Sequence, residues 1–440
     1  MRKTVRRTPN GACLLSMVLI VAVAGSFSKA SDSNLAKENA ELKQRVEKLE
    51  GEVEGLKKGA PVPGASLTPG AETSETKLPV WSSLDIQIYG YLKFDAAYDT
   101  SRIDNGDYAK WVDRENRNDD DDQFNMTANE SRFGVRITGP DNNRMKASGR
   151  VEIDFYGGGS ENKANPMMRH AYMKLDWPAE KFNIIAGQTS DVFSPLVPST
   201  VNYSVCWWVG NIGYRRPQIR LTKEIPLDSD MSMKLEGALA RTIGRADTIA
   251  GTESGEDAGF PSLQARVSVM LPNHSIFGVS GHWGKEEYDT TVFGNHKDFT
   301  SWSLNFDLTQ PVCDKVTVKA ELFTGQDLDA YLGGIGQGVI TDTTKPNFYE
   351  EIGSKGGWIA ASLGPWDDTR YNIGVSMDDV DRGNVNDGDR TLNQSVFGNV
   401  FYSLSKNVDW ALELSHWRTE YRGHGDADSL RVQTALIYKF

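Results

Sequence analysis

The sequence lacks an apolar run long enough to cross a bilayer as a helix. Its longest apolar stretch, residues 12–24, is shorter than the roughly 20 residues that a spanning helix needs, and the mean hydropathy is −0.47. A bundle of membrane helices is therefore excluded. Aromatic residues are not scarce: 43 of the 440 residues are Phe, Tyr or Trp, which argues against a disordered chain. What remains is a large soluble domain, several small ones, or a transmembrane β-barrel, whose lumen-facing residues lower its hydropathy.

Cysteine, histidine and positive charge are also in short supply. Cys13 lies in the N-terminal apolar stretch, while Cys206 and Cys313 could pair in an oxidising compartment or stay apart. None of the six histidines belongs to a G-x-S-x-G, H-E-x-x-H or Cys/His zinc pattern, and residues 281–285 lack the spacing of a phosphate-binding loop. The sequence thus predicts no enzyme, no cofactor and no bound metal. A net charge of −12 also speaks against nucleic acid as a partner.

The first thirty residues have the three parts of a secretory signal peptide. A basic start precedes the apolar stretch 12–24, and Ser28, Lys29 and Ala30 form a small-x-small cleavage site. We predict a signal peptide over 1–30, cut after Ala30. A permanent anchor helix is the alternative, and the shortness of the apolar stretch disfavours it.

Residues 31–58 carry a seven-residue repeat that predicts a coiled coil. Its d positions are Leu35, Leu42, Leu49 and Leu56, and its a positions are Asn39, Val46 and Val53. A lone solvated helix is the alternative, because only about three heptads are present. Valine at a with leucine at d leans toward two strands. Residues 59–80 follow, rich in Gly, Pro, Ser and Thr, and are predicted to form a semi-extended linker.

From residue 81 to residue 440 the dominant period is two. Ile86 and Ile88 take one face while Gln87 takes the other, and about sixteen segments share this alternation. Their connectors alternate between short turns, such as the one expected at Gln310 and Pro311, and long polar stretches. We therefore predict an all-β fold, a 16-stranded antiparallel transmembrane barrel over 81–440. A secreted sandwich or propeller would show a domain break or a repeated motif, and neither is visible.

An even number of strands places both barrel termini on the short-turn side, so the coiled coil is expected in the periplasm. The final strand carries the sharpest single feature. Leu436, Tyr438 and Phe440 share one of its faces, which puts aromatic rings at the membrane interface. Such a strand resembles the assembly signal of Gram-negative outer-membrane proteins, with Tyr438 and Phe440 as the residues that matter.

Several short motifs accompany this architecture: SRFG at 131–134, RHAY at 169–172, AGQT at 186–189 and GYRRPQIR at 213–220. Together with the signal peptide, coiled coil and linker, they resemble the general porin superfamily, most closely the DcaP-like porins. The resemblance covers the whole chain after the signal peptide. It implies a homotrimer in outer-membrane lipid and lipopolysaccharide that passes small hydrophilic solutes, among them anions such as dicarboxylates. The dimer-leaning heptads depart from a trimer.

In porins of this architecture the third long loop folds into the lumen and narrows it. The resemblance therefore implies that residues 191–214, the third long loop of this chain, lie inside the barrel. The alternative is that this loop lies outside like the others. On the lumen-facing parity of four early strands, seven basic residues stand against three acidic ones, which favours an anion-preferring pore. The residues expected to line or narrow the pore are Arg132, Arg136, Arg150, Lys174, Asp191, Arg216, Gln218 and Arg220. Alternatively, the arginines pair with loop carboxylates such as Asp191 and merely brace the constriction.

Two further segments have a composition that indicates other roles. The acidic run at 119–122 either binds divalent cations or is simply solvated. The glycine-rich stretch 333–338 predicts mobility rather than a rigid binding face. A structural anchor or adhesin, tethering the envelope through the coiled coil, is the second function that the sequence allows.

Overall fold

The computed structural model describes residues 44, 48, 84–115, 121–140, 144–158, 163–228, 230–244, 258–289, 296–341 and 349–440. The chain divides into two units, 1–78 and 79–440, and the fold below is that of the second. Gln44 and Lys48 are helical. The predicted signal peptide and linker, and all seven predicted heptad residues, lie outside the described residues. Within the described ranges, no helix has the length and apolar character needed to span a membrane.

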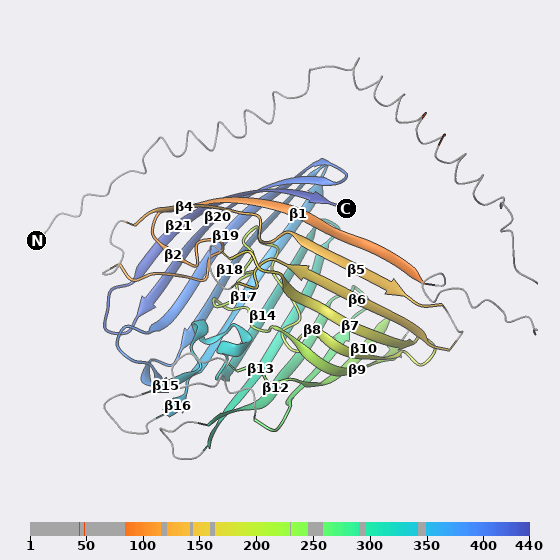
Figure 1. The fold of residues 1–440 in the computed structure, drawn as a ribbon, viewed down its shortest axis with the longest axis horizontal. Helices are drawn as coiled ribbons and strands as arrows, with labels where there is room; N and C mark the ends of the chain where they lie inside the picture. The colour runs from red at the N-terminus through yellow and green to blue at the C-terminus, as the bar shows by residue number, and fades with distance from the viewer. Residues whose placement is uncertain are drawn as a thin grey trace, which may run out of the picture. The chain divides into compact units, whose positions relative to one another are not determined.

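The second unit is a closed antiparallel barrel (Figure 1). The wall strands, in spatial order, are β1 (Asp85–Asp99), β4 (Gln123–Thr127) with β5 (Arg132–Thr138), β6 (Lys146–Asp154), β7 (Met167–Trp177), β8 (Phe182–Ser190), β9 (Arg215–Asp228), β10 (Met231–Ala240), β11 (Ser262–Met270), β12 (Ile276–Asp289), β13 (His296–Cys313), β14 (Val316–Gln326), β17 (Gly353–Trp366), β18 (Thr369–Val380), β19 (Arg390–Ser405), β20 (Val408–Tyr421) and β21 (Ala427–Lys439). β21 pairs with β1 and closes the sheet.

The wall has sixteen positions, as predicted. The sheet contains 17 strands, but β4 and β5 share one position. β4 pairs with residues 95–99 of β1, and β5 pairs with residues 85–91 of the same strand. Residues 128–131 interrupt the ladder between them.

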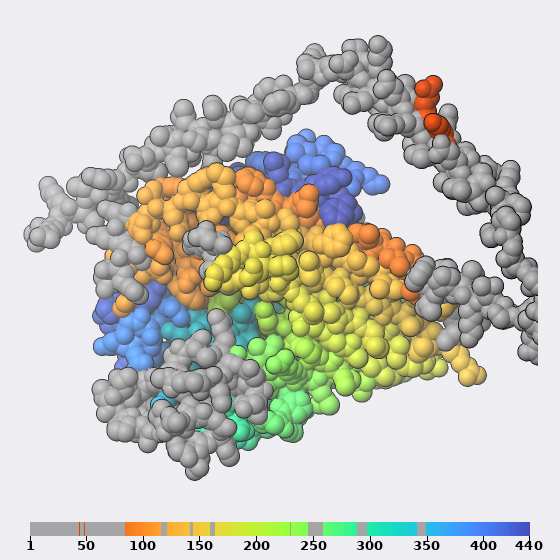
Figure 2. Space-filling model, in the orientation of Figure 1, coloured from red at the N-terminus to blue at the C-terminus, as the bar shows by residue number. Residues whose placement is uncertain are grey.

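The period-two pattern places apolar side chains on the outside and polar ones on the inside. On β1, Ile88 and Leu92 are 57% and 59% exposed, whereas Lys93 and Asp95 are buried. On β20, Glu413 is buried between exposed neighbours. This inversion of a soluble protein's pattern is what a bilayer demands of a barrel wall. Figure 2 shows the outer surface of one side, where the orange, yellow and green side chains of successive strands form a continuous wall.

The barrel seam lies between the first and last strands. Leu92 pairs with Tyr438 and Phe94 with Leu436. Phe440 adds two backbone hydrogen bonds of 3.1 Å to Gly90, one in each direction, so that the ladder continues to that residue.

One predicted turn is wrong by a few residues. β13 runs through Gln310 and Pro311 to Cys313, and the reversal falls at Asp314 and Lys315. A bulge between Pro311 and Cys313 accommodates the proline, which cannot donate to the ladder. Alternation alone does not reveal a bulge, so the turn was predicted too early.

Three of the long connections fold into the barrel. The first contains β2 (Ile103–Asp104) and β3 (Trp111–Val112), and the second is 191–214. The third, between β14 and β17, contains η2 (Asp329–Tyr331), η3 (Gly334–Gly336), β15 (Val339–Thr341) and β16 (Tyr349–Glu351). Another 3₁₀ turn, η4 (Arg382–Asn384), lies between β18 and β19.

The prediction that 333–338 is mobile is wrong. Ile335 is fully buried, its N–H donates to Asp378 at 3.2 Å, and its carbonyl accepts from Arg390 at 3.0 Å. Gly334 has φ +59°, a left-handed conformation that glycine adopts without strain. Glycine serves here to turn a packed segment tightly, which composition cannot distinguish from flexibility.

Candidate functional site

The loop 191–214 crosses the barrel interior, as the resemblance implied, and does not lie outside the barrel. Its backbone is held by carboxylates of distant strands. Glu321 on β14 accepts from the N–H of Leu196 at 2.7 Å, and Glu413 on β20 accepts from the N–H of Val201 at 2.6 Å. Lys93 on β1 donates to the Val201 carbonyl at 2.7 Å. Buried backbone groups need such partners, so wall side chains fix the loop in place.

A cluster of charges lies on the inner face of β5, β6 and β7. Glu152 contacts three guanidinium groups: those of Arg150, Arg169 at 3.0 Å and Arg132 at 3.5 Å. Arg169 also pairs with Asp154 at 2.5 Å. Two carboxylates, Glu152 and Asp154, thus face three guanidinium groups, so positive charge is in excess within this cluster.

Tyr203 of the crossing loop joins this cluster. Its hydroxyl donates to Asp154 at 3.1 Å. Burial raises the pKa of Tyr203 to about 12, so the hydroxyl remains a neutral donor at physiological pH. The loop is thereby tied to the basic wall as well as to the strands facing it.

Two inward-facing cations are held by neutral groups. Arg136 lies over the Tyr89 ring at 4.2 Å and reaches Gln87 at 3.4 Å. Arg220 donates to Gln218 at 3.0 Å and to the Ser190 carbonyl. Neutral partners fix the direction of a guanidinium without cancelling its charge.

The structure brings Arg216, Asp191 and Gln218 together with Arg220 where the crossing loop meets β9. Arg216 pairs with Asp191 at 2.9 Å, and both side chains are essentially fully buried. This pair braces the loop, as the alternative for these arginines anticipated. Lys174 lies apart from them, pairing with Asp176 at 3.3 Å.

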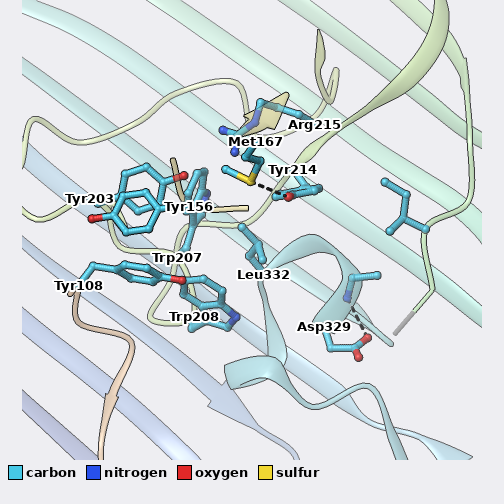
Figure 3. Close-up of a pocket in the computed structure, with 12 residues that line it drawn as sticks. Tyr108, Tyr156, Met167, Tyr203, Trp207, Trp208, Tyr214, Arg215, Asp329 and Leu332 are labelled. Atoms are coloured by element: carbon cyan, nitrogen blue, oxygen red, sulfur yellow. Dashed lines mark hydrogen bonds between the residues drawn. The ribbon is translucent and has the colours of Figure 1, made fainter. Parts of the chain in front are cut away.

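Two larger hollows lie among the described residues of the barrel interior, besides one of about 60 Å³ beside the crossing loop. One, of about 260 Å³, is lined by residues at the long-loop ends of β6, β7 and β9 together with loop residues (Figure 3). The other, of about 330 Å³, is lined by residues 198–200 of the crossing loop and by strands near the short turns. The interior therefore has space near the long loops and near the short turns.

Comparison with protein families places residues 16–273 in the DcaP outer membrane protein family. The chain belongs to this family. Comparison with curated proteins gives no match.

Solved structures agree with the DcaP assignment at the level of the fold. The barrel resembles the outer membrane channel DcaP of Acinetobacter baumannii, with TM-score 0.66 and 19% identity over 82% of this chain and 98% of that one. An anion-selective porin from Comamonas acidovorans matches with TM-score 0.52 and 13% identity, over 81% of this chain and 100% of that one. OmpT of Vibrio cholerae, in its trimer form, matches with TM-score 0.51 and 11% identity, over 81% of this chain and 100% of that one. The fold of this DcaP family member is thus that of outer-membrane porins.

Sequence reasoning missed two important arginines of this DcaP family member. Arg169 belongs to the apolar parity of its strand, but a bulge between Glu152 and Ile153 turns it inward. Arg215 precedes the inward-facing Arg216 and lines the hollow of about 260 Å³ at the long-loop end. Both lie within motifs noted above, at 169–172 and 213–220, which is the only signal that could have singled them out.

Ion-binding and redox features can also be located. Glu286, Asp327 and Asp329 have carboxylate oxygens within 4.8 Å of one another, and we assign no metal to this group. Of the acidic run 119–122, the described Asp122 accepts from Tyr98 at 2.9 Å. Cys206 is buried and Cys313 exposed, and the two are not bonded to each other.

Proposed function

We propose that the protein is a passive outer-membrane channel that prefers small anions, in particular small carboxylates. The observation that carries this proposal is the pair of interior cations held by neutral groups, Arg136 and Arg220. Arg132, Arg150 and Lys174 also belong to the basic lining, although each of them lies beside a carboxylate, Glu152 or Asp176. Arg216, Asp191 and Gln218 would shape the constriction. Because surrounding walls of low dielectric focus the field of such charges, anions concentrate inside.

The similarity to an anion-selective porin supports the proposal through fold alone. We expect no enzymatic activity, since the family and its structural relatives are channels and porins. The chain would assemble as a homotrimer in outer-membrane lipid and lipopolysaccharide, in line with the trimeric relative. Tyr438 and Phe440 would act as the assembly signal.

The N-terminal organisation is part of the proposal. A signal peptide over 1–30 would be removed, and a periplasmic coiled coil over 31–58 would connect through the linker 59–80 to the barrel 81–440. An envelope anchor or adhesin is the second candidate, favoured by the heptads alone. Deleting residues 35–58 separates the two: a channel still conducts, whereas a tether loses its association with the cell wall.

Conductance in planar bilayers with unequal salt on the two sides tests the main proposal. We expect stepwise openings with a reversal potential on the anion side, shifted toward the cation side by Arg136→Gln combined with Arg220→Gln. Arg382→Gln is the control, because the Arg382 side chain is 65% exposed in the connection between β18 and β19 and forms an ion pair with Glu420. Absence of conductance from a folded barrel would overturn the channel, and cation preference would overturn the anion assignment.

A further inference from the structure

The hollow at the long-loop end contains a buried cation with unused donors. Arg215, the first residue of β9, is only 5% exposed. Its Nε and Nη2 have no hydrogen-bond partner among the residues that the structure describes. The adjacent Arg216, in contrast, pairs with Asp191 at 2.9 Å. Because an unsatisfied buried donor is costly, above all on a charged group, Arg215 is primed for an anionic ligand.

The guanidinium of Arg215 is fixed in orientation by two rings. It lies 5.4 Å from the centre of the Trp207 ring and 5.2 Å from that of Tyr214. Nε and Nη2 form one edge of the planar guanidinium, and two parallel N–H groups on such an edge match the two oxygens of a carboxylate. A donor pair held in place before binding loses little entropy when the ligand arrives.

Aromatic side chains make up the larger part of the remaining lining of the hollow (Figure 3). Six rings line it, those of Tyr108, Tyr156, Tyr203, Trp207, Trp208 and Tyr214. Tyr156 and Tyr203 have centroids 4.0 Å apart, and Tyr108 meets Tyr156 edge-on at 5.1 Å. At about 260 Å³ the space is just below the roughly 300–1,000 Å³ of sites for drug-sized ligands, so a single ring is the appropriate size.

We infer that this hollow is a saturable binding site for a monocarboxylate carried on one flat aromatic ring. The carboxylate accepts from the Nε and Nη2 edge of Arg215, and the ring packs among the tyrosines and tryptophans. A second carboxylate on the far side of the ring is disfavoured, because Asp329 lines the hollow away from Arg215 (Figure 3). The inference rests on the proposed channel and narrows its solutes from small carboxylates to one-ring monocarboxylates.

Isothermal titration calorimetry on the purified protein in detergent micelles tests this site, with sodium benzoate, acetate and terephthalate as probes. Benzoate should bind at least about tenfold more tightly than either of the others. Arg215→Gln should weaken benzoate binding by about tenfold to a hundredfold, the range expected for hydrogen bonds to a charged group. Arg215→Lys should fall between, since it keeps the charge and loses the paired donors.

Two further variants separate the ring contacts and the net charge from the carboxylate contact. Tyr108→Leu should bring benzoate affinity toward that of acetate. Arg382→Gln removes the same charge from an exposed position at the long-loop end, and benzoate affinity should not change. If Arg215→Gln does not fold, Arg215→Lys carries the comparison.

Equal affinities for benzoate and acetate would overturn the aromatic site, and tighter binding of terephthalate would overturn the single-carboxylate assignment. An equal loss of binding in Arg382→Gln would reduce the effect to net charge. Bilayer conductance, measured on the same preparation, distinguishes the two levels of the argument. Benzoate binding without conductance would overturn the channel proposal and leave the binding site in place. Conductance without benzoate binding would overturn the binding site and leave the channel proposal in place.

Discussion

Replacing Asp191 by Asn should destabilise the barrel by about 3–5 kcal/mol, because Arg216 would become an uncompensated buried charge. The two side chains lie 2.9 Å apart and are 1% and 0% exposed. Asp191 also accepts from the N–H of Tyr214 at 2.8 Å and from Gln264 at 2.7 Å. An asparagine cannot accept from all of these donors, since one of its two oxygens is replaced by an NH₂ group.

The measurement is equilibrium unfolding in urea and detergent, followed by tryptophan fluorescence. Arg216→Met alone should also destabilise, whereas the double variant should recover a coupling of about 2–3 kcal/mol. The exposed pair Lys181 and Glu224, 3.2 Å apart with each side chain 45% exposed, is the control, and its cycle should give at most about 1 kcal/mol. A loss below about 1 kcal/mol in Asp191→Asn, or strictly additive single variants, would refute the bracing role.

Three other predictions concern a buried thiol, a closely packed glycine and Phe440. At pH 8 a maleimide should label the exposed Cys313 and spare Cys206, because burial raises the pKa of the Cys206 thiol to about 12 and thus keeps it neutral; labelling of Cys206 in the folded protein would contradict this. Gly210→Ala should lower the free energy of unfolding by about 1–3 kcal/mol, because Gly210 has φ +122° and an added Cβ would lie 2.3 Å from a backbone carbonyl oxygen. Gly425→Ala is the control: its Cβ would meet nothing within 4 Å, so thermal unfolding should not change. Phe440→Ala should lower the yield of heat-modifiable barrel in outer membranes, and an unchanged yield would argue against an assembly signal there.

The wall could be predicted from the sequence because a bilayer-facing strand imposes a period of two on every residue. The connection 191–214 was even bounded correctly, since β8 ends at Ser190 and β9 begins at Arg215. Errors arose where a single residue breaks the period. The bulges beside Pro311 and Glu152 shifted a turn and turned Arg169 inward, and neither has a local signature strong enough to read.

The contents of the barrel were less predictable than its wall. Which arginine is neutralised depends on partners far away in the chain, as when Arg431 on the last strand pairs with Asp99 on the first at 2.8 Å. The inward folding of residues 327–341 gave no periodic signal, because its buried residues pack in short irregular turns. Lumen-facing parity therefore identified candidate residues, and only three-dimensional contacts separate those that brace from those that remain available.

The inward-folded connections also affect how the barrel resists lateral pressure. Asn393 on β19 donates to the carbonyls of Lys110 and Trp208, tying two inward connections to one point of the wall. Trp208 in turn donates its N–H to Leu332 of the third. These contacts connect the wall to the segments inside it, so the inner segments share lateral pressure on the wall and help the barrel to keep its cross-section. Wall and contents should accordingly open as a single cooperative unit in hydrogen exchange.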